Sequence, residues 1–220
     1  DRVRVEVHEP LPDGTEARKK LIYVRSAFRN EADFIVDGFG RMPSPLDQPR
    51  VTRLIDVDAS VSDNYRRLLM ETLEGLFSDE VPDSTPKHEL RDRLIGQVRS
   101  SLLSVFPDLR LDGFGGLDNA GSTQGTFYFT KGSASGFLYK NLSAGEKAVF
   151  DLLLDAVIKQ RYFDDSIWCI DEPEAHLNTR VQARLLNALL HLLPEHSQLL
   201  IASHSIGFMR RAWEMAKEAP

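Results

Sequence analysis

Apolar and polar residues alternate along the first part of the chain in the manner of β-strands. The segments RVRVEV (2–7) and KKLIYVRS (19–26) flank PLPDGTEA (10–17), whose Pro-Asp-Gly core is a strong turn signal. We therefore expect a β-hairpin near the start of the chain, within a β-rich segment that runs over residues 1–57.

Helical spacing of apolar residues replaces this alternation over residues 58–107 and predicts a helical hairpin subdomain. Ser62 is placed to cap its first helix, and Pro107 stops its second. The two apolar stripes consist of Tyr65, Leu68, Leu69, Leu73 and Leu76 in the first helix and Leu90, Leu94, Val98 and Leu102 in the second.

Residues 108–220 form the third predicted unit, and it begins with irregular structure. The glycine-rich segment 112–125 and the segment KGSAS (131–135) predict loops, and TFYFT (126–130) between them predicts a short strand. From Leu142 onward the pattern changes to helix, strand, helix, strand and helix, which is typical of a parallel sheet covered by helices.

The last two predicted strands and the helix between them form a βαβ unit. SIWCI (166–170) and QLLIASH (198–204) are the strands, and because they run parallel, their carboxyl ends lie at the same edge of the sheet. That edge is where open α/β sheets bind ligands. The intervening helix buries a stripe made of Val181, Leu185, Ala188, Leu189 and Leu192.

Composition excludes several classes of protein. The 220 residues are 42% hydrophobic, which is enough to bury a substantial core, and the net charge of −6 argues against a protein coated by nucleic acid. The single cysteine, Cys169, lies in an apolar strand where it is expected to pack as a small hydrophobic residue, so a reducing compartment such as the cytoplasm fits. No apolar run reaches the length of a membrane span.

Two acids and a histidine gather at the predicted ligand-binding edge. Asp171 and Glu172 end one strand and His204, between Ser203 and Ser205, ends the other. Asp171 can position a hydrated magnesium ion, Glu172 can accept a proton from an attacking water, and the histidine can donate to a phosphate oxygen. Alternatively, the acids precede a helix N-terminus, where negative charge is favoured, and the histidine is an ordinary loop residue.

A second candidate site lies at the start of the helix that follows Leu142. Ser143 and Glu146 have the spacing of a capping box, and that structural role alone explains both residues. It does not explain Gly145, because glycine in a helix costs about 1 kcal/mol relative to alanine unless another group must approach the backbone closely. Exposed amides at a helix N-terminus bind anions, and a nucleotide phosphate is the natural candidate.

Three segments in this order resemble motifs of the ATP-binding cassette (ABC) ATPases. LSAGE (142–146) is similar to the signature loop, IWCIDEPEAHL (167–177) to the Walker B strand with its D-loop, and IASHS (201–205) to the switch-histidine loop. The resemblance is strongest to the branch without transporters, which includes the SMC, RecF and OLD-type proteins. It implies a P-loop NTPase-like head with an α/β fold.

The resemblance also implies roles for individual residues. Asp171 would hold Mg²⁺, Glu172 would be the general base, and His204 would sense the γ-phosphate. Two heads would sandwich two ATP molecules, so a second head is the expected partner, with DNA or an effector nuclease as further ones, in DNA repair or anti-phage defence. The residues expected to bind the nucleotide are Ser143, Ala144, Gly145, Glu146 and Asn178.

The sequence departs from the family pattern at two places. Asn178 stands where the D-loop usually has aspartate, and Thr179 with Gln182 can also be read as a helix cap, T-x-x-Q. No glycine is followed by lysine, so the Walker A motif G-x-x-x-x-G-K-[ST] is absent from these 220 residues. We expect a fragment whose Walker A lobe lies upstream and whose ATPase activity depends on that lobe.

Two rival functions use the same residues. One is a scaffold that binds nucleotide without hydrolysis and recruits an effector, and the other is a metal-dependent nuclease, for which Asp56 and Asp58 or His176 offer weak additional ligands. DNA phosphates could also be contacted by arginines, although a solvated surface is the preferred interpretation for them. These arginines are Arg25, Arg29, Arg91, Arg93 and Arg99.

Overall fold

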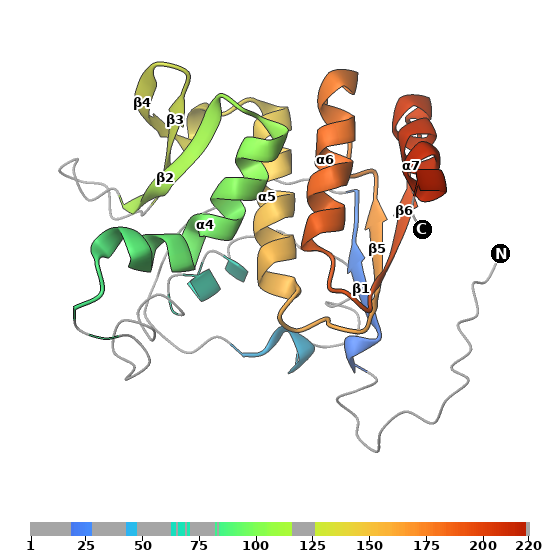
Figure 1. Ribbon diagram of the computed structural model, residues 1–220, viewed down its shortest axis with the longest axis horizontal. Helices are drawn as coiled ribbons and strands as arrows, with labels where there is room; N and C mark the ends of the chain where they lie inside the picture. The colour runs from blue at the N-terminus through green and yellow to red at the C-terminus, as the bar shows by residue number, and fades with distance from the viewer. Residues whose placement is uncertain are drawn as a thin grey trace.

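Two three-stranded sheets lie on either side of a central helix, α5 (Ala144–Lys159), as Figure 1 shows. The computed structural model describes residues 19–27, 43–47, 63–64, 66–68, 70, 82, 84–115 and 126–218. The first strand and the turn of the predicted N-terminal hairpin, Asp56, Asp58, Arg29 and most of the first hairpin helix lie outside these residues. The second strand of the predicted hairpin is described and contains the strand Ile22–Arg25, which pairs with the strand Ile167–Asp171. In this part of the chain no helix combines the length and the apolar character that a bilayer span requires.

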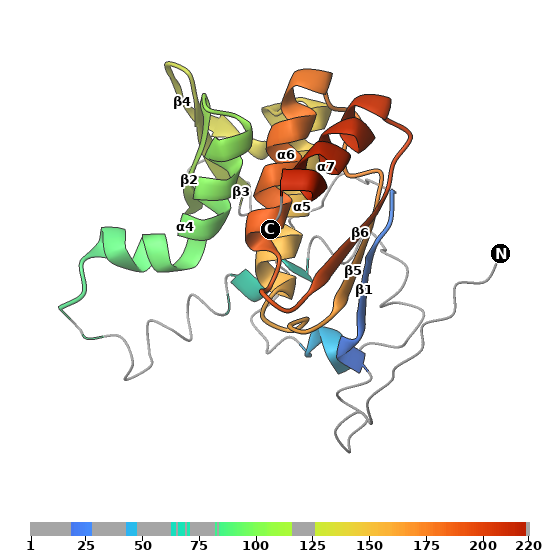
Figure 2. The ribbon, with the colours of Figure 1, turned by 45° about the vertical axis from the view of Figure 1, so that its right-hand side comes forward.

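The first sheet carries the predicted βαβ unit, which is confirmed. Its strands are β1 (Ile22–Arg25), β5 (Ile167–Asp171) and β6 (Gln198–Ala202), in the order β1-β5-β6 and all parallel. Helix α6 (Thr179–Leu192) connects β5 to β6, and α7 (Ile206–Glu218) follows β6. Figure 2 shows α5, α6 and α7 on one side of this sheet. The fold class, α/β with a parallel sheet flanked by helices, is therefore confirmed.

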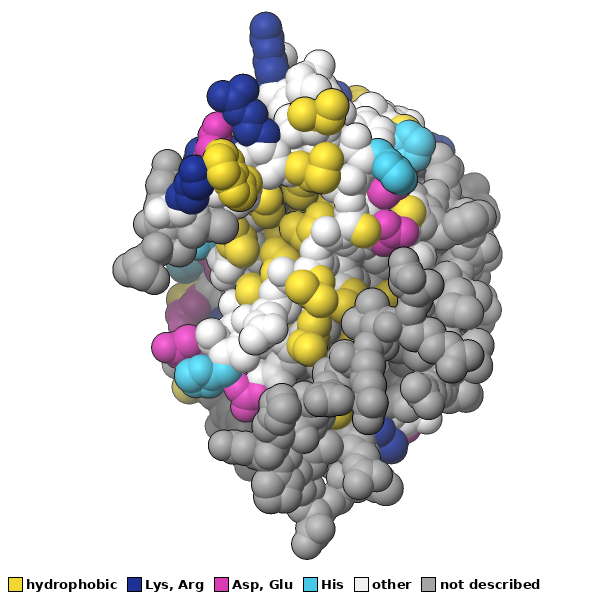
Figure 3. Space-filling model, turned by 90° about the vertical axis from the view of Figure 1, so that its right-hand side faces the viewer, with side chains coloured by type: hydrophobic (Ala, Val, Ile, Leu, Met, Phe, Trp, Pro, Cys, Tyr) yellow, Lys and Arg dark blue, Asp and Glu magenta, His cyan; other side chains and the backbone are white. Residues whose placement is uncertain are grey.

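The two sides of this parallel sheet differ in burial. Trp168 and Ile170 of β5 point toward the helices and are buried, whereas Cys169 between them is only half-buried. Burial raises the pKa of the Cys169 thiol, in keeping with its predicted role as a small apolar residue. Figure 3 shows hydrophobic side chains gathered on the face that carries β6 and α7. The most exposed large ones there are Leu200, Ile206, Met209 and Trp213.

The second sheet is antiparallel and corrects two predicted loops. It consists of β2 (Leu109–Gly115), β3 (Thr126–Lys131) and β4 (Ala134–Leu138). The strand β2 extends through Gly115, inside the predicted loop 112–125, because a register shift between Leu111 and Gly113 accommodates the glycines in the ladder. The predicted loop 131–135 is a tight hairpin turn, in which Gly132 has a φ of 58° that favours glycine.

Helix α4 (Lys87–Val105) is the second helix of the predicted hairpin, and it packs against β2, α5 and α6. The described residues of the first hairpin helix are helical, and Asn64, Arg67 and Leu68 among them are buried. Two short 3-10 helices, η1 (Pro45–Asp47) and η2 (Tyr139–Asn141), complete the described elements. The boundaries near residues 57 and 107 stay predictions.

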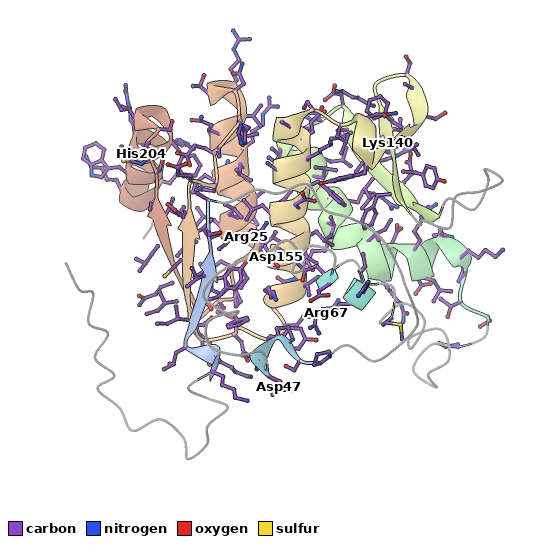
Figure 4. All side chains as sticks on the ribbon, turned by 180° about the vertical axis from the view of Figure 1, so that it is seen from behind. Arg25, Asp47, Arg67, Lys140, Asp155 and His204 are labelled. Atoms are coloured by element: carbon purple, nitrogen blue, oxygen red, sulfur yellow. The ribbon has the colours of Figure 1, made fainter. Side chains whose placement is uncertain are left out.

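Helix α5 is buried along nearly its whole length because it is covered on both sides. Its Phe150 packs edge-on against Phe127 and Phe129 of β3, with ring centroids 4.9 and 5.2 Å apart. On the other side its Asp155, with none of its side chain exposed, lies 3.5 Å from the Arg25 guanidinium of β1. Figure 4 shows these two charged residues together.

The Arg25 prediction is therefore wrong, because this side chain is neither solvated nor available to DNA: only 2% of it is exposed. Asp155 also accepts hydrogen bonds from the Tyr23 hydroxyl and from Asn64 Nδ2, the latter at 2.5 Å. Burial by itself would raise the pKa of Asp155, but Arg25, Lys159 and these two hydrogen bonds outweigh it and hold the pKa below its ordinary value. Asp155 is thus a buried carboxylate that stays ionised.

Candidate functional site

The carboxyl ends of β5 and β6 bring together two of the predicted catalytic residues. Asp171 is the last residue of β5 and pairs with Ala202 of β6, and the Glu172 amide donates to the Ala202 carbonyl at 2.8 Å. His204 Nε2 lies 3.2 Å from Glu172 Oε1. The imidazole is 93% exposed and the Glu172 side chain 33% exposed, so both can meet a ligand at this edge.

The backbone at Glu172 is not extended like the strand that it follows. Glu172 has a φ of 44° and His176 a φ of 65°, a region that non-glycine residues rarely occupy. Two successive turns close between them, because Ala175 N donates to Glu172 O and Leu177 N donates to Glu174 O, each at 3.0 Å. Such left-handed residues are held only where the surroundings fix them, and they cluster at functional sites.

The loop formed by residues 172–177 separates the two acids from helix α6. Asn178 caps this helix, since its side-chain oxygen accepts from Arg180 N at 3.0 Å, and no acidic residue lies in the first turn. The alternative cap of Thr179 with Gln182 is therefore wrong. Asp171 and Glu172 precede this helix, as the alternative interpretation had it, but they lie outside its first turn.

The signature-like segment starts α5 and contains the predicted capping box. Ser143 Oγ accepts from Glu146 N at 3.3 Å, and Glu146 Oε2 accepts from Ser143 N at 2.9 Å. The Lys131 ammonium lies 2.8 Å from Glu146 Oε1. Burial by itself would raise the pKa of Glu146, but the bonds from Lys131 and Ser143 lower it below its ordinary value. Ser143 and Ala144 are exposed, so the helix N-terminus remains accessible.

Gly145 is needed because α5 touches the 172–177 loop. A Cβ at this position would lie 2.8 Å from the His176 carbonyl oxygen and 3.1 Å from Leu177 Cδ2, closer than real side chains come. The close approach inferred from the sequence thus exists, but the approaching group in the structure is a loop of the same chain. The signature-like segment and the loop after the Walker B-like strand are in direct contact.

Sequence reasoning missed one acid of this loop. Glu174 is buried and its Oε1 accepts hydrogen bonds from Ser203 Oγ and from Ser205 N, on either side of His204. Ser205 Oγ in turn donates to Gln182 Oε1 of α6 at 2.8 Å. The available signal was a third acid, Glu174, two residues after the pair Asp171 and Glu172. Only its partners in the loop after β6, which are distant in sequence, show that it is buried.

The donor set at this edge suits magnesium that is held largely by water and substrate. Among the described residues, no three His, Cys, Asp or Glu side chains converge as a protein-only metal site would require. Magnesium usually keeps several waters and binds one or two carboxylates plus substrate phosphates, so the exposed Asp171 carboxylate is an adequate ligand. His176 is also exposed and belongs to no such cluster.

The parallel sheet, the Walker B-like strand end and the switch-like loop define a P-loop NTPase-like head of the ABC type. The family model described as "AAA domain, putative AbiEii toxin, Type IV TA system" matches residues 16–210, and the chain belongs to this AAA-domain family. A search of curated proteins finds no match.

Solved structures of SMC proteins resemble parts of the chain at low identity. A structure titled "Structural biochemistry of ATP-driven dimerization and DNA stimulated activation of SMC ATPases" shares 18% identity over 57% of this chain and 78% of that chain, with a TM-score of 0.40. Smc head domains from Pyrococcus furiosus and Pyrococcus yayanosii share 15% identity. Their matches cover 70% and 69% of this chain but 38% and 29% of those chains, with TM-scores of 0.40 and 0.41.

Proposed function

We propose that this chain forms part of an ABC-type head that binds ATP and hydrolyses its terminal phosphate. The observation that carries the proposal is the pair Glu172 and His204, 3.2 Å apart and accessible at the carboxyl edge of the parallel sheet. An acid that can take a proton and an imidazole that can donate to a phosphate are the groups that water attack on a phosphoryl group needs.

Each residue at the edge has a distinct part in this reaction. Glu172 accepts a proton from the attacking water, whose oxygen bonds to the γ-phosphorus as the bond to the β-phosphate oxygen breaks and ADP leaves. His204 donates a hydrogen bond to a γ-phosphate oxygen. Asp171 would hold Mg²⁺, and such an ion neutralises charge on the β- and γ-phosphate oxygens.

The start of α5 serves a second nucleotide. Ser143 and Ala144 are exposed at a helix N-terminus, which favours an anionic phosphate, and Gly145 follows them in the first turn. The capping bonds of Glu146 fix the position of Ser143, and Asn178 follows Leu177, whose side chain lies against Gly145. We propose that these residues contact ATP held by a second head, so that ATP joins two heads and hydrolysis releases them.

We propose that a phosphate-binding loop outside these 220 residues completes the site. The 220 residues contain no G-x-x-x-x-G-K-[ST] motif, so hydrolysis requires a Walker A segment in addition to them. For the biological setting, the family description refers to a toxin–antitoxin system, which is nearer to anti-phage defence than to DNA repair. DNA or an effector nuclease is the proposed further partner.

The test compares the full-length wild type with Glu172→Gln in ATP turnover and in mass in solution, with and without ATP and magnesium. We expect the variant to lose turnover by roughly 100-fold or more and to accumulate as an ATP-dependent dimer, because it binds nucleotide without releasing it. Glu195→Gln, an exposed acid remote from the site, is the matched control. A wild type that neither cleaves ATP nor changes mass would contradict the proposal.

A further inference from the structure

Glu174 is the buried acid of the 172–177 loop, and the proposed reaction leaves it without a role. Only 7% of the residue is exposed. Its Oε1 accepts from the Ser203 hydroxyl and, at 3.2 Å, from the Ser205 amide. These two donors flank His204, so one carboxylate oxygen holds the switch-like loop from both sides of the imidazole.

The same loop is fixed a second time through α6. Ser205 Oγ donates to Gln182 Oε1 at 2.8 Å, and Gln182 Nε2 donates to the Leu177 carbonyl, at the end of the 172–177 loop, at 3.3 Å. Ser205 Oγ also accepts from Phe208 N at 3.3 Å in the first turn of α7. The hydrogen bonds therefore run in a closed circuit from the loop after β5 to the loop after β6 and back.

His204 itself depends on this circuit for its position. Its side chain is 93% exposed, and among the described residues the only ion-pair partner recorded for it is Glu172. An exposed imidazole with one partner keeps its orientation only if its backbone is held. Ser203 and Ser205 hold this backbone, and both are hydrogen-bonded to Glu174, which lies two residues after Glu172.

The environment of Glu174 is costly for the fold. Among the described residues no hydrogen-bond partner reaches its second oxygen, Oε2, which is buried, and such atoms are rare because they give up hydration without compensation. The cost is understandable if the carboxylate is kept for the geometry that its other oxygen imposes.

We propose that Glu174 is a positioning residue that acts through Ser203 and Ser205 to hold the His204 imidazole against Glu172. The inference rests on the proposed ATPase function and adds to it a residue that touches neither the nucleotide nor the attacking water. Its predicted signature is a loss of turnover that requires His204 to be present.

The kinetic test uses the full-length protein with Glu174→Ala, His204→Ala and the double variant. We expect Glu174→Ala to lower kcat by roughly 10- to 100-fold while KM for ATP stays within about threefold, because the catalytic groups and not the binding groups are displaced. In the His204→Ala background the same substitution should cost almost nothing further. Equal losses in both backgrounds would show a merely structural role and overturn the inference.

Two further variants sharpen this result. Glu174→Gln keeps an acceptor oxygen at the same place, so it should restore kcat to within about threefold of wild type. Glu195→Ala removes an exposed acid of the loop before β6 and should leave kcat unchanged. A Glu174→Ala protein with wild-type turnover would also overturn the inference.

Amide hydrogen exchange tests the positioning without any activity. The Ser205 amide donates to Glu174 Oε1 and to Ser203 Oγ, which is itself held by Glu174, so Glu174→Ala should speed its exchange by about tenfold or more while β5 amides stay protected. Unchanged exchange over residues 203–208 would overturn the inference even if ATP is cleaved. A wild type that cleaves no ATP would contradict the proposed function instead, with the exchange result still deciding what Glu174 does.

Discussion

On one side of α5, the ring of Phe150 packs against the rings of Phe127, Phe129 and Tyr139. On the other side, Asp155 pairs with Arg25 and accepts hydrogen bonds from Tyr23 and Asn64. The first contact joins the helix to the antiparallel sheet mainly by aromatic packing, next to the ion pair between Lys131 and Glu146 at the start of the helix. The second joins it to the parallel sheet by a buried charge with several hydrogen-bond donors.

The two contacts differ in how they respond to change. Apolar packing tolerates replacement by other side chains of similar volume, because it depends on filled space. A buried ion pair gives little net stabilisation when intact, but loss of one partner leaves an uncompensated charge in the core. Substitutions should therefore cost less at the contact between α5 and the antiparallel sheet than at its contact with the parallel sheet, which carries the site.

The largest predicted effect follows from removing the buried carboxylate. Asp155→Ala should lower the free energy of unfolding by about 3–5 kcal/mol, because the buried Arg25 then loses the carboxylate that balances its charge. Urea denaturation monitored by circular dichroism measures this. Asp164→Ala breaks an exposed pair with Lys20 and should cost less than about 1 kcal/mol. Equal costs for the two variants would remove the distinction between the contacts.

Lowering the pH should weaken the contact between Asp155 and Arg25 by less than the Asp155→Ala substitution does. The pKa of Asp155 is lower in the folded protein than its ordinary value of 3.8, so its contribution is complete above that pH and is lost as the pH falls through the folded-state pKa. Urea denaturation repeated at decreasing pH should show this loss below about pH 4. Asp155→Asn should flatten the dependence in that range, and an unaltered pH profile would contradict the assignment.

The apolar contact should give a smaller effect. Phe150→Leu should lower the free energy of unfolding by about 1–2 kcal/mol, since it keeps most of the volume and loses the edge-on ring contacts. Urea denaturation under the same conditions as for Asp155→Ala measures the difference. If Phe150→Leu proves the more damaging of the two, the comparison is reversed.

The smallest predicted effect is at the end of α5. Ser143→Ala removes one half of the capping box and should cost about 1 kcal/mol, whereas Ser143→Gly should cost only a few tenths. Thermal unfolding of both variants beside wild type measures this difference. Identical melting temperatures for alanine and wild type would show that the cap contributes nothing to stability.

Periodic and local signals predicted the parts of the molecule that depend on neighbours in sequence. The strands β5 and β6, the helix between them and the capping box of Ser143 and Glu146 all follow from spacing. Asp171, Glu172 and His204 reach one edge because parallel strands end together. The chemistry assigned to these residues stays a prediction.

Contacts between distant residues could not be inferred in the same way. Arg25 alternates with Tyr23 on the buried side of β1, but its carboxylate partner comes from α5, far along the chain. Glu174 is buried where it accepts hydrogen bonds from two serines of another loop. The strand β2 reaches Gly115 despite its glycines because β3 supplies the pairing. Each of these depends on a tertiary neighbour that spacing does not specify.

The pairing of β1 with β5 bears on how the protein is made. Ile22 lies opposite Ile167, so β1 leaves the ribosome long before its neighbour is synthesised. At 5–20 residues per second the delay is roughly 7–30 s, and an unpaired strand is prone to aggregate over such times. A chaperone that shields β1 on the nascent chain would therefore be expected to raise the yield of folded protein more than one that acts after release.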